Sequence, residues 1–245
     1  MLSELGYVLP TGTCLIDISE RSHRSVSSSQ ALCYARLSYF RYAMYKVGPV
    51  LSISHGMGIP SAGILLHEVI KLMYHAGVKD PVFIRLGTCG GIDLPPGTVV
   101  VTKEALDGRL RPYLDTIVLG EVKSRLAKMD LGLAKNLVMA GDQLDKFKTV
   151  LGKTISTDDF YEGQGRLDGA ICEYNEEDKM NYLKKVAEAG VKNMEMEALV
   201  FGALTHMAGI RSAVVCVTLL DRLKGDQVRG EGQCLVITSF VDNNT

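Results

Sequence analysis

Short apolar segments alternate along most of the chain with longer segments of helical periodicity. Strands are predicted where apolar and β-branched residues are dense, at residues 47–54, 81–86, 98–102, 149–156 and 211–220. The last of these, R-S-A-V-V-C-V-T-L-L, is apolar at successive positions. That pattern is typical of a central strand whose two faces are both buried.

Four helices are predicted between or after these strands. Pro60 begins the first, Gly77 ends it, and its apolar residues recur at helical spacing at Leu65, Val69, Leu72 and Met73. Residues 131–140 predict the second helix, and residues 196–207, apolar on most sides, predict a buried one.

The remaining helix has the clearest start signal. Asn175 precedes three acidic residues, so a capping side chain stands before negative charges that favour the positive end of a helix dipole. Gly190 ends this helix, and its inward-facing residues are Leu183, Val186 and Ala187.

The alternation of strands and helices indicates an α/β protein with a largely parallel or mixed sheet. The two ends depart from the pattern, because residues 1–40 have weak periodicity and the C-terminal residues contain one short strand-like run. We therefore divide the chain into a divergent N-terminal segment (1–40), one folded domain (41–227) and a divergent C-terminal tail (228–245).

Composition is compatible with an enzyme and excludes some other classes. The 27 basic and 28 acidic residues nearly cancel and form no basic run, which argues against a nucleic-acid-binding protein. No apolar run is long enough to span a membrane, and Glu4 and Asp17 interrupt any signal-peptide pattern. The six cysteines are scattered without a C-x-x-C pair. A reducing cytoplasmic location is therefore expected.

The most informative motif is D-F-Y-E-G-Q-G-R at residues 159–166. Gln164 offers a donor beside an acceptor, Arg166 offers a fork of donors, and Phe160 offers a face for stacking. Together they could read a small planar ligand with carbonyls and an N–H, such as uracil. The alternative is a surface turn around two glycines with solvated polar side chains.

Two further motifs carry polar groups that could bind a ligand. R-L-G-T-C-G-G at residues 85–91 follows a strand, so its amides, with Arg85 and Thr88, could bind an anion; the alternative is an arginine paired with a carboxylate beside a turn. In M-E-M-E at residues 194–197, Glu197 could bridge two ribose hydroxyls and Met196 could pack on the sugar. The alternatives are complementation of a helix dipole by the glutamates and core filling by the methionines.

The motif H-G-M-G-I-P-S at residues 55–61 resembles a dinucleotide fingerprint. Its next glycine, Gly63, comes too late for the G-x-G-x-x-G pattern, so this alternative is weak. Cys89 with His55 could form a nucleophile and base, but a buried thiol is the more ordinary role for Cys89.

Six motifs in the expected order identify residues 41–227, roughly three quarters of the chain, as resembling animal-type uridine phosphorylases of the nucleoside phosphorylase superfamily. They are R-Y-A-M-Y-K-V-G-P-V, S-H-G-M-G-I-P-S, R-L-G-T-C-G-G-I, D-F-Y-E-G-Q-G-R-L-D-G-A, N-M-E-M-E-A and V-V-C-V-T-L-L-D-R-L. The resemblance implies a single-domain three-layer fold with a central mixed sheet flanked by helices. It also implies reversible conversion of uridine and phosphate to uracil and ribose 1-phosphate in pyrimidine salvage.

The resemblance also implies roles for individual residues, with Arg85, Arg166 and Glu197 as the catalytic set. The expected phosphate ligands are Arg41, Arg85 and Thr88, with Arg41 donated across a homodimer interface. The expected ribose ligands are Met196 and Glu197. The uracil site is expected to comprise Phe160, Cys89, Gly90, Gln164, Arg166, Leu219 and Leu220. Arg222 is expected to brace the uracil-reading loop, and neither a metal nor another cofactor is implied.

The chain departs from the family pattern at both ends. Residues 1–40 contain only two glycines, Gly6 and Gly12, and lack the glycine-rich phosphate loop; Ile18 to Ser22 is the nearest candidate, and His23 is no convincing match for the family's N-terminal histidine. After Gln227 the sequence diverges from the family's C-terminal segment. Two hypotheses follow: an active uridine phosphorylase, or a catalytically impaired homologue that still binds pyrimidine nucleosides or pairs with active subunits.

Overall fold

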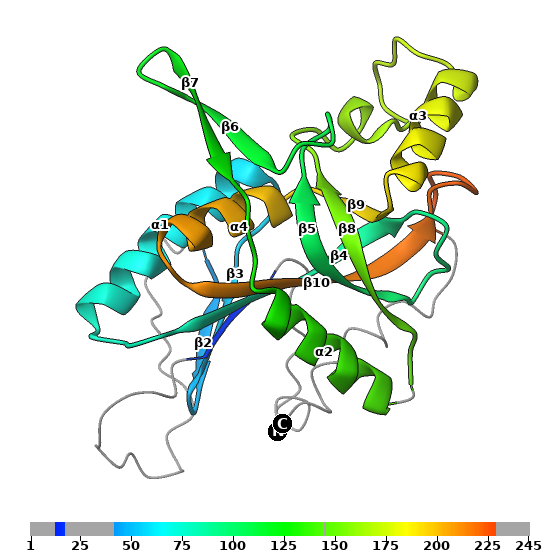
Figure 1. Ribbon diagram of the computed structural model, residues 1–245. Coiled ribbons are helices and arrows are strands. Elements are labelled where there is room, and N and C mark those ends of the chain that lie inside the picture. The colour runs from blue at the N-terminus through cyan, green and yellow to red at the C-terminus, as the bar shows by residue number, and fades with distance from the viewer. Residues whose placement is uncertain (1–12, 18–41, 145, 229–245) are drawn as a thin grey trace.

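A computed structural model describes residues 13–17, 42–144 and 146–228, which form one mixed sheet, a hairpin and helices packed around them (Figure 1). The strands are β1 (Thr13–Asp17), β2 (Met44–Val47), β3 (Val50–Ser54), β4 (Val82–Gly91), β5 (Val99–Leu106), β6 (Tyr113–Val118), β7 (Glu121–Leu126), β8 (Thr149–Ser156), β9 (Val191–Glu195) and β10 (Arg211–Asp221). The helices are α1 (Ile59–His75), α2 (Leu131–Leu144), α3 (Glu176–Glu188) and α4 (Ala198–Met207), with a 3₁₀ turn at Glu162–Gln164.

The main sheet curls so that β4 has three neighbours. Its strand order is β10-β5-β8-β9-β4-β1-β3-β2, and β10 also pairs with β4, in parallel. The strands β4, β10, β5, β8 and β9 therefore close into a ring. Both parallel and antiparallel pairs occur in it, so the predicted α/β fold with a mixed central sheet is confirmed.

Helices cover the sheet on more than one side and each buries an apolar stripe. One core cluster joins α1 and α4 to β3, β4 and β10, a second joins α3 to β8 and β9, and a third joins α2 to β5 and β10. Figure 1 shows α1 and α4 on one side of the sheet and α2 on another, with α3 near the ends of β8 and β9. Burying apolar stripes in this way supplies the main driving force for the fold.

The predicted helices are confirmed, with one exception in detail. Asn175 caps α3 in a full capping box: its side chain accepts from the amide of Asp178, whose carboxylate accepts from the amide of Asn175. Leu183 and Val186 face the core as predicted. In α1, however, Leu72 is exposed, because the buried stripe runs through Leu65, Val69 and Met73.

Two strand predictions were wrong in their boundaries. Residues 47–54 were expected to form one strand, but a turn at Gly48, whose φ is +53°, separates β2 from β3. R-L-G-T-C-G-G was expected to follow a strand, but β4 continues through it to Gly91. The glycines fit that strand because side chains lie against them: a Cβ at Gly87 would meet Arg85 Nη2 at 2.7 Å, and one at Gly90 would meet Arg222 Cδ at 2.8 Å.

Strand β1 was not predicted, and it comes from the segment that the sequence sets apart. It lies between β3 and β4 and is antiparallel to both, with Cys14 and Ile16 buried in the core. The remainder of residues 1–40 and the tail beyond residue 228 lie outside the described residues, as do the candidate phosphate segment from Ile18 and His23. The domain boundaries at 40 and 227 stay predictions.

Candidate functional site

A cavity of about 180 Å³ lies where β4, β9 and β10 meet the segment after β8. Five separate parts of the chain line it: the turn between β3 and α1, strand β4, the loop around residue 164, the end of β9, and the end of β10. The lining residues are Gly56, Met57, Arg85, Thr88, Cys89, Gly90, Phe160, Gln164, Arg166, Met194, Glu195, Met196, Glu197, Leu219, Leu220 and Val228.

The predicted site residues that the structure describes all lie in this one cavity. They are Arg85, Thr88, Cys89, Gly90, Phe160, Gln164, Arg166, Met196, Glu197, Leu219 and Leu220. Arg41 lies outside the described residues. The fold therefore brings together motifs that are more than 100 residues apart in sequence, while their individual roles remain predictions.

Arg85 lines the cavity and lies between the carboxylates of Glu195 and Glu197. Its Nη1 is 3.0 Å from Glu195 Oε2 and 3.1 Å from Cys216 Sγ, and its Nη2 pairs with Glu197. The side chain is 2% exposed. Burial alone would lower the pKa of this guanidinium, but the two glutamates and the Cys216 sulfur raise it, so Arg85 is a permanent buried cation.

The two glutamates differ in what they bind. Glu195 accepts hydrogen bonds of 2.9 Å from the amides of Glu197 and Ala198, so it caps α4 as the dipole alternative expected. Glu197 Oε1 accepts a hydrogen bond of 2.5 Å from the amide of Gly58. Burial, with the negative charge of Glu197 nearby, raises the pKa of Glu195 to about 6.

That contact with Glu197 also bears on the dinucleotide interpretation of residues 55–61. The amide of Gly58, at the start of α1, would be needed to bind a pyrophosphate at the helix N-terminus. It instead donates to the Glu197 carboxylate, so a second anion at this amide would meet a negative charge. The turn therefore serves the cavity by holding Glu197.

His55 directly precedes this turn, and the sequence suggested it only as the base for a Cys89 nucleophile. It is fully buried, and within the described structure neither of its ring nitrogens has a hydrogen-bond partner. Burial and the nearby charge of Arg85 lower its pKa to about 4. His55 is therefore a neutral imidazole near neutral pH, and Gly56 and Met57 after it line the cavity, which the motif S-H-G-M-G could have indicated.

Gln164 and Arg166 are buried, so the alternative in which these polar side chains are solvated on a surface turn is wrong. Gln164 is 4% and Arg166 8% exposed, whereas residues 159–163 before them, Phe160 included, are exposed. Gly165, with φ at +65°, adopts the left-handed conformation that ends the 3₁₀ turn. The guanidinium of Arg166 lies over the Phe160 ring, with Cζ 4.5 Å from the ring centroid, a contact that was not predicted.

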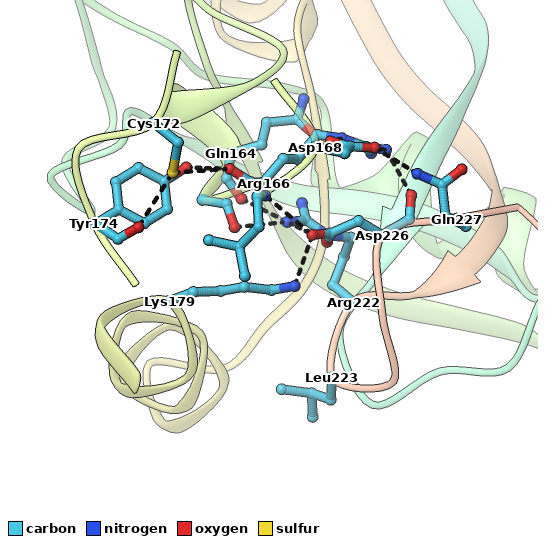
Figure 2. Close-up of polar contacts among 12 residues, drawn as sticks. Gln164, Arg166, Asp168, Cys172, Tyr174, Lys179, Arg222, Leu223, Asp226 and Gln227 are labelled. Atoms are coloured by element: carbon cyan, nitrogen blue, oxygen red, sulfur yellow. Dashed lines mark hydrogen bonds and ion pairs between the residues drawn. The ribbon is translucent and has the colours of Figure 1, made fainter. Parts of the chain in front are cut away.

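Arg166 is oriented by Asp168. Its Nε and Nη2 each donate a hydrogen bond of 2.9 Å to the Asp168 carboxylate, and this bidentate pair fixes the plane of the guanidinium (Figure 2). The same contacts lower the pKa of Asp168, chiefly through the hydrogen bonds from Arg166, so that carboxylate is ionised.

The bracing role predicted for Arg222 is confirmed. This residue is fully buried, and its Nη2 donates to the main-chain carbonyl oxygens of Gln164 at 2.8 Å and Gly165 at 3.3 Å. Its side chain passes over Gly90 on the way, as the close approach to that glycine indicates. A buried cation from the end of β10 thus holds the backbone of the loop that carries Gln164 and Arg166 (Figure 2).

Cys89 is a buried thiol. It is 6% exposed, and burial raises its pKa well above the ordinary value. A thiolate nucleophile needs the opposite, a lowered pKa and access, so the alternative of a Cys89–His55 nucleophile is not supported.

The described residues contain no group of three or more His, Cys, Asp or Glu side chains that could hold a metal ion. Within the same residues, no helix is long and apolar enough to cross a membrane.

Comparison with known proteins places these features in a family. A protein-family model described as the phosphorylase superfamily matches residues 20–233. Uridine phosphorylase 1 from Mus musculus is 53% identical over 196 residues, which cover 80% of this chain and 63% of that protein. The chain spans 59% to 63% of the length of the mouse and human uridine phosphorylases it matches.

Relatives from Schistosoma mansoni are covered more fully. Uridine phosphorylase A and inactive uridine phosphorylase B are 41% and 39% identical over 223 residues, which cover 88% of this chain and 75% of each relative. The crystal structure of the uridine phosphorylase from that organism in complex with thymine matches with a TM-score of 0.82 at 39% identity, covering 88% of this chain and 76% of that one. Sequence and fold therefore indicate the same family.

Proposed function

The chain belongs to the phosphorylase superfamily, and we propose that it catalyses the reversible phosphorolysis of uridine to uracil and ribose 1-phosphate. One observation carries the proposal: the described residues expected to bind base, sugar and phosphate all line a single cavity. The similarity to uridine phosphorylases over four fifths of the chain supports the choice of uridine as the nucleoside.

Phosphate would be the nucleophile, and Arg85 and Thr88 would bind it. Both line the cavity at the end of β4, and Arg85 is a cation throughout the accessible pH range. An anion that reaches Arg85 competes with Glu197 for the guanidinium, because Glu197 already pairs with it. Glu195 on the other side of Arg85 would keep the guanidinium in place during that exchange.

Ribose would lie between phosphate and base, next to Met196 and Glu197. An ionised carboxylate accepts hydrogen bonds from two vicinal hydroxyls, and the Glu197 carboxylate is buried and held by the amide of Gly58. As in glycoside hydrolysis, the bond to the sugar breaks through an oxocarbenium-like transition state. Attack on the sugar by bound phosphate requires no nucleophile from the protein.

Uracil would leave with negative charge on its ring, which Gln164 and Arg166 would stabilise. Preorganised donors aimed at developing charge typically contribute about 100- to 1000-fold in rate. Arg166 meets that requirement, since Asp168 fixes its plane and Phe160 packs against its face. Phosphate is a co-substrate in this scheme, and we propose no cofactor.

We further propose that the working unit is a homodimer in which Arg41 of one subunit completes the phosphate site of the other. We also propose a cytoplasmic role in pyrimidine salvage. The dimer proposal is supported by the resemblance of R-Y-A-M-Y-K to the family motif that carries this arginine. Its test is the molar mass of the purified chain by light scattering, combined with the activity of Arg41→Ala.

The deciding experiment is release of uracil from uridine by the purified chain with and without phosphate. Phosphate-dependent release would establish the activity. Absence of release, with uracil still raising the melting temperature, would favour the impaired homologue. The distinction requires measurement, because a relative named uridine phosphorylase A and one named inactive uridine phosphorylase B are almost equally similar to this chain.

A further inference from the structure

The segment after β10 folds back beneath the loop that carries Gln164 and Arg166. A turn begins at Asp221, which accepts from the amides of Leu223 through its side chain and Lys224 through its carbonyl oxygen. Gly225, with φ at +136°, lets the chain turn again before Asp226. This geometry directs the Asp226 side chain inward, toward the loop and α3 (Figure 2).

Asp226 makes polar contacts with three separate parts of the chain. Its Oδ2 accepts from Lys179 Nζ on α3 at 2.7 Å and from the amide of Leu167 at 3.2 Å. Its Oδ1 accepts from Arg222 Nε at 3.2 Å. Its main-chain oxygen accepts from Arg166 Nη2 at 2.5 Å. Asp226 thus joins α3, the end of β10, and the loop that carries Gln164 and Arg166, which we call the base loop.

The ion pairs within this cluster are buried. The side chains of Lys179 and Asp226 are 6% and 8% exposed, and that of Arg222 is inaccessible to solvent. Burial alone would raise the pKa of Asp226, but the hydrogen bonds from Lys179 and Leu167 and the charge of Arg222 lower it below the ordinary value. Asp226 is therefore an anion between two buried cations, and removing its charge would leave both without this counter-charge.

From these contacts we infer that Asp226 and Lys179 are positioning residues for recognition of the base. This inference rests on the proposed function, in which Gln164 and Arg166 read uracil. The contacts of the cluster go to the backbone on both sides of those side chains, at Gln164, Gly165 and Leu167, and to Arg166 itself. Asp226 and Lys179 do not line the cavity and so act through the loop.

If the cluster only stabilised the fold, its loss would weaken binding of uridine and of phosphate alike. If it positions the loop, its loss weakens binding of uridine alone. The phosphate ligands proposed above, Arg85 and Thr88, lie on β4 and receive no hydrogen bond from Asp226 or Lys179 in the described structure. Loosening the base loop should therefore weaken binding of uridine and uracil while leaving binding of phosphate unchanged.

The test uses the full chain and three variants: Asp226→Asn, Lys179→Met and the two combined. Initial rates are measured with uridine and phosphate each varied, and calorimetry measures the Kd for uracil. We expect Asp226→Asn to raise the KM for uridine and the Kd for uracil about tenfold, equivalent to about 1.4 kcal/mol of binding. The KM for phosphate should stay within twofold. The combined variant should not exceed the product of the single effects, because its two changes remove the same pair.

Lys184→Met is the matched control, since Lys184 is exposed on the same helix and should leave every constant unchanged. The inference is overturned if Asp226→Asn lowers the melting temperature and kcat while leaving both KM values and the uracil Kd at their original values. If the unsubstituted chain binds uracil without turnover, the proposed activity fails, and the uracil Kd of the variants still decides this inference. If the unsubstituted chain binds no uracil, both proposals are wrong.

Discussion

Arg85 on β4 and Glu197 before α4, 112 residues apart in the sequence, form a buried ion pair on the floor of the cavity. Arg85 is the proposed ligand of phosphate, and Glu197 is the proposed ligand of ribose. In this structure each neutralises the other, so the affinity for phosphate and the placement of the sugar are coupled through a single contact. Coupling of this kind can be tested by changing the charge of one partner while keeping its shape.

Glu197→Gln removes a negative charge beside Arg85 and retains an oxygen that can accept from the amide of Gly58. Charge-assisted hydrogen bonds contribute about 1.5–3 kcal/mol, so losing those to the ribose hydroxyls should lower kcat/KM for uridine about 10- to 100-fold. The KM for phosphate should not rise, because a competitor for Arg85 has been weakened. Steady-state kinetics with both substrates varied will measure this, with the exposed Glu188→Gln as control. An equal rise in both KM values would refute the coupling.

Arg166→Ala should reduce phosphorolysis of uridine about 100- to 1000-fold, because it removes a donor aimed at the charge that develops on uracil. The fold should survive, since Asp168 is partly exposed and water can solvate it after the change. Uracil release and the melting temperature report the two effects separately. Arg211→Ala, at an exposed arginine that begins β10, is the control. Near-normal turnover in Arg166→Ala would rule out the proposed role in uracil recognition.

Rules that act within a few residues made part of this fold predictable. Asn175 and Asp178 form their capping box because the signal lies within one helical turn. Residues 211–221 form a strand buried on both faces because their composition allows little else. The site residues were predictable for a different reason, since each belongs to a contiguous motif of a known family.

Features that depend on distant partners were not predictable. Strand β9 was not predicted, because it is short and its pairing with β4 and β8 cannot be read from five residues. In the sequence, Asp226 and Lys179 are isolated charges in polar stretches, and no local pattern indicates a role for them. Their importance comes from burial and from partners about 50 residues away, which only the folded chain provides.

The glycines of R-L-G-T-C-G-G illustrate how a correct motif can carry an incorrect explanation. They were expected to expose amides to a ligand, yet they lie within β4 and make room for two arginine side chains. A Cβ at Gly90 would come within 3 Å of Arg222 Cδ and Cγ. The spacing of small residues in this motif therefore reflects side-chain packing as well as access to the cavity.

This packing predicts the outcome of Gly90→Ala. Forcing a methyl group against Arg222 should cost about 1–3 kcal/mol of unfolding free energy and lower the melting temperature by several degrees. Because Arg222 holds the backbone at Gln164, the KM for uridine should rise more than the KM for phosphate. Gly108→Ala is the control, since a Cβ there meets nothing within 4 Å. An unchanged melting temperature in Gly90→Ala would mean that Arg222 moves aside without cost.

The buried imidazole of His55 predicts a dependence of stability on pH. Its pKa falls to about 4 in the folded protein, from an ordinary value near 6.5, mainly because burial opposes the charged form. Between those values the unfolded chain binds more protons than the folded one, so the stability that His55 contributes is present above pH 6.5 and is lost as the pH falls toward 4. The pKa of Glu195 is raised, so its contribution to stability increases as the pH falls, opposite to that of His55. Because Glu195 is present in both the unsubstituted chain and a His55 variant, its contribution cancels when the two are compared at the same pH.

His55→Gln should therefore flatten the pH dependence. Between pH 7 and pH 5 the unsubstituted chain should lose about 2 kcal/mol more unfolding free energy than the variant, which corresponds to several degrees in melting temperature. Urea unfolding at the two pH values measures the difference directly. His67→Gln, at an exposed histidine of α1, should follow the unsubstituted chain at both values. If His55→Gln loses as much stability as the unsubstituted chain, protonation of His55 does not oppose folding, and the imidazole has a partner that keeps its charge stable in the interior.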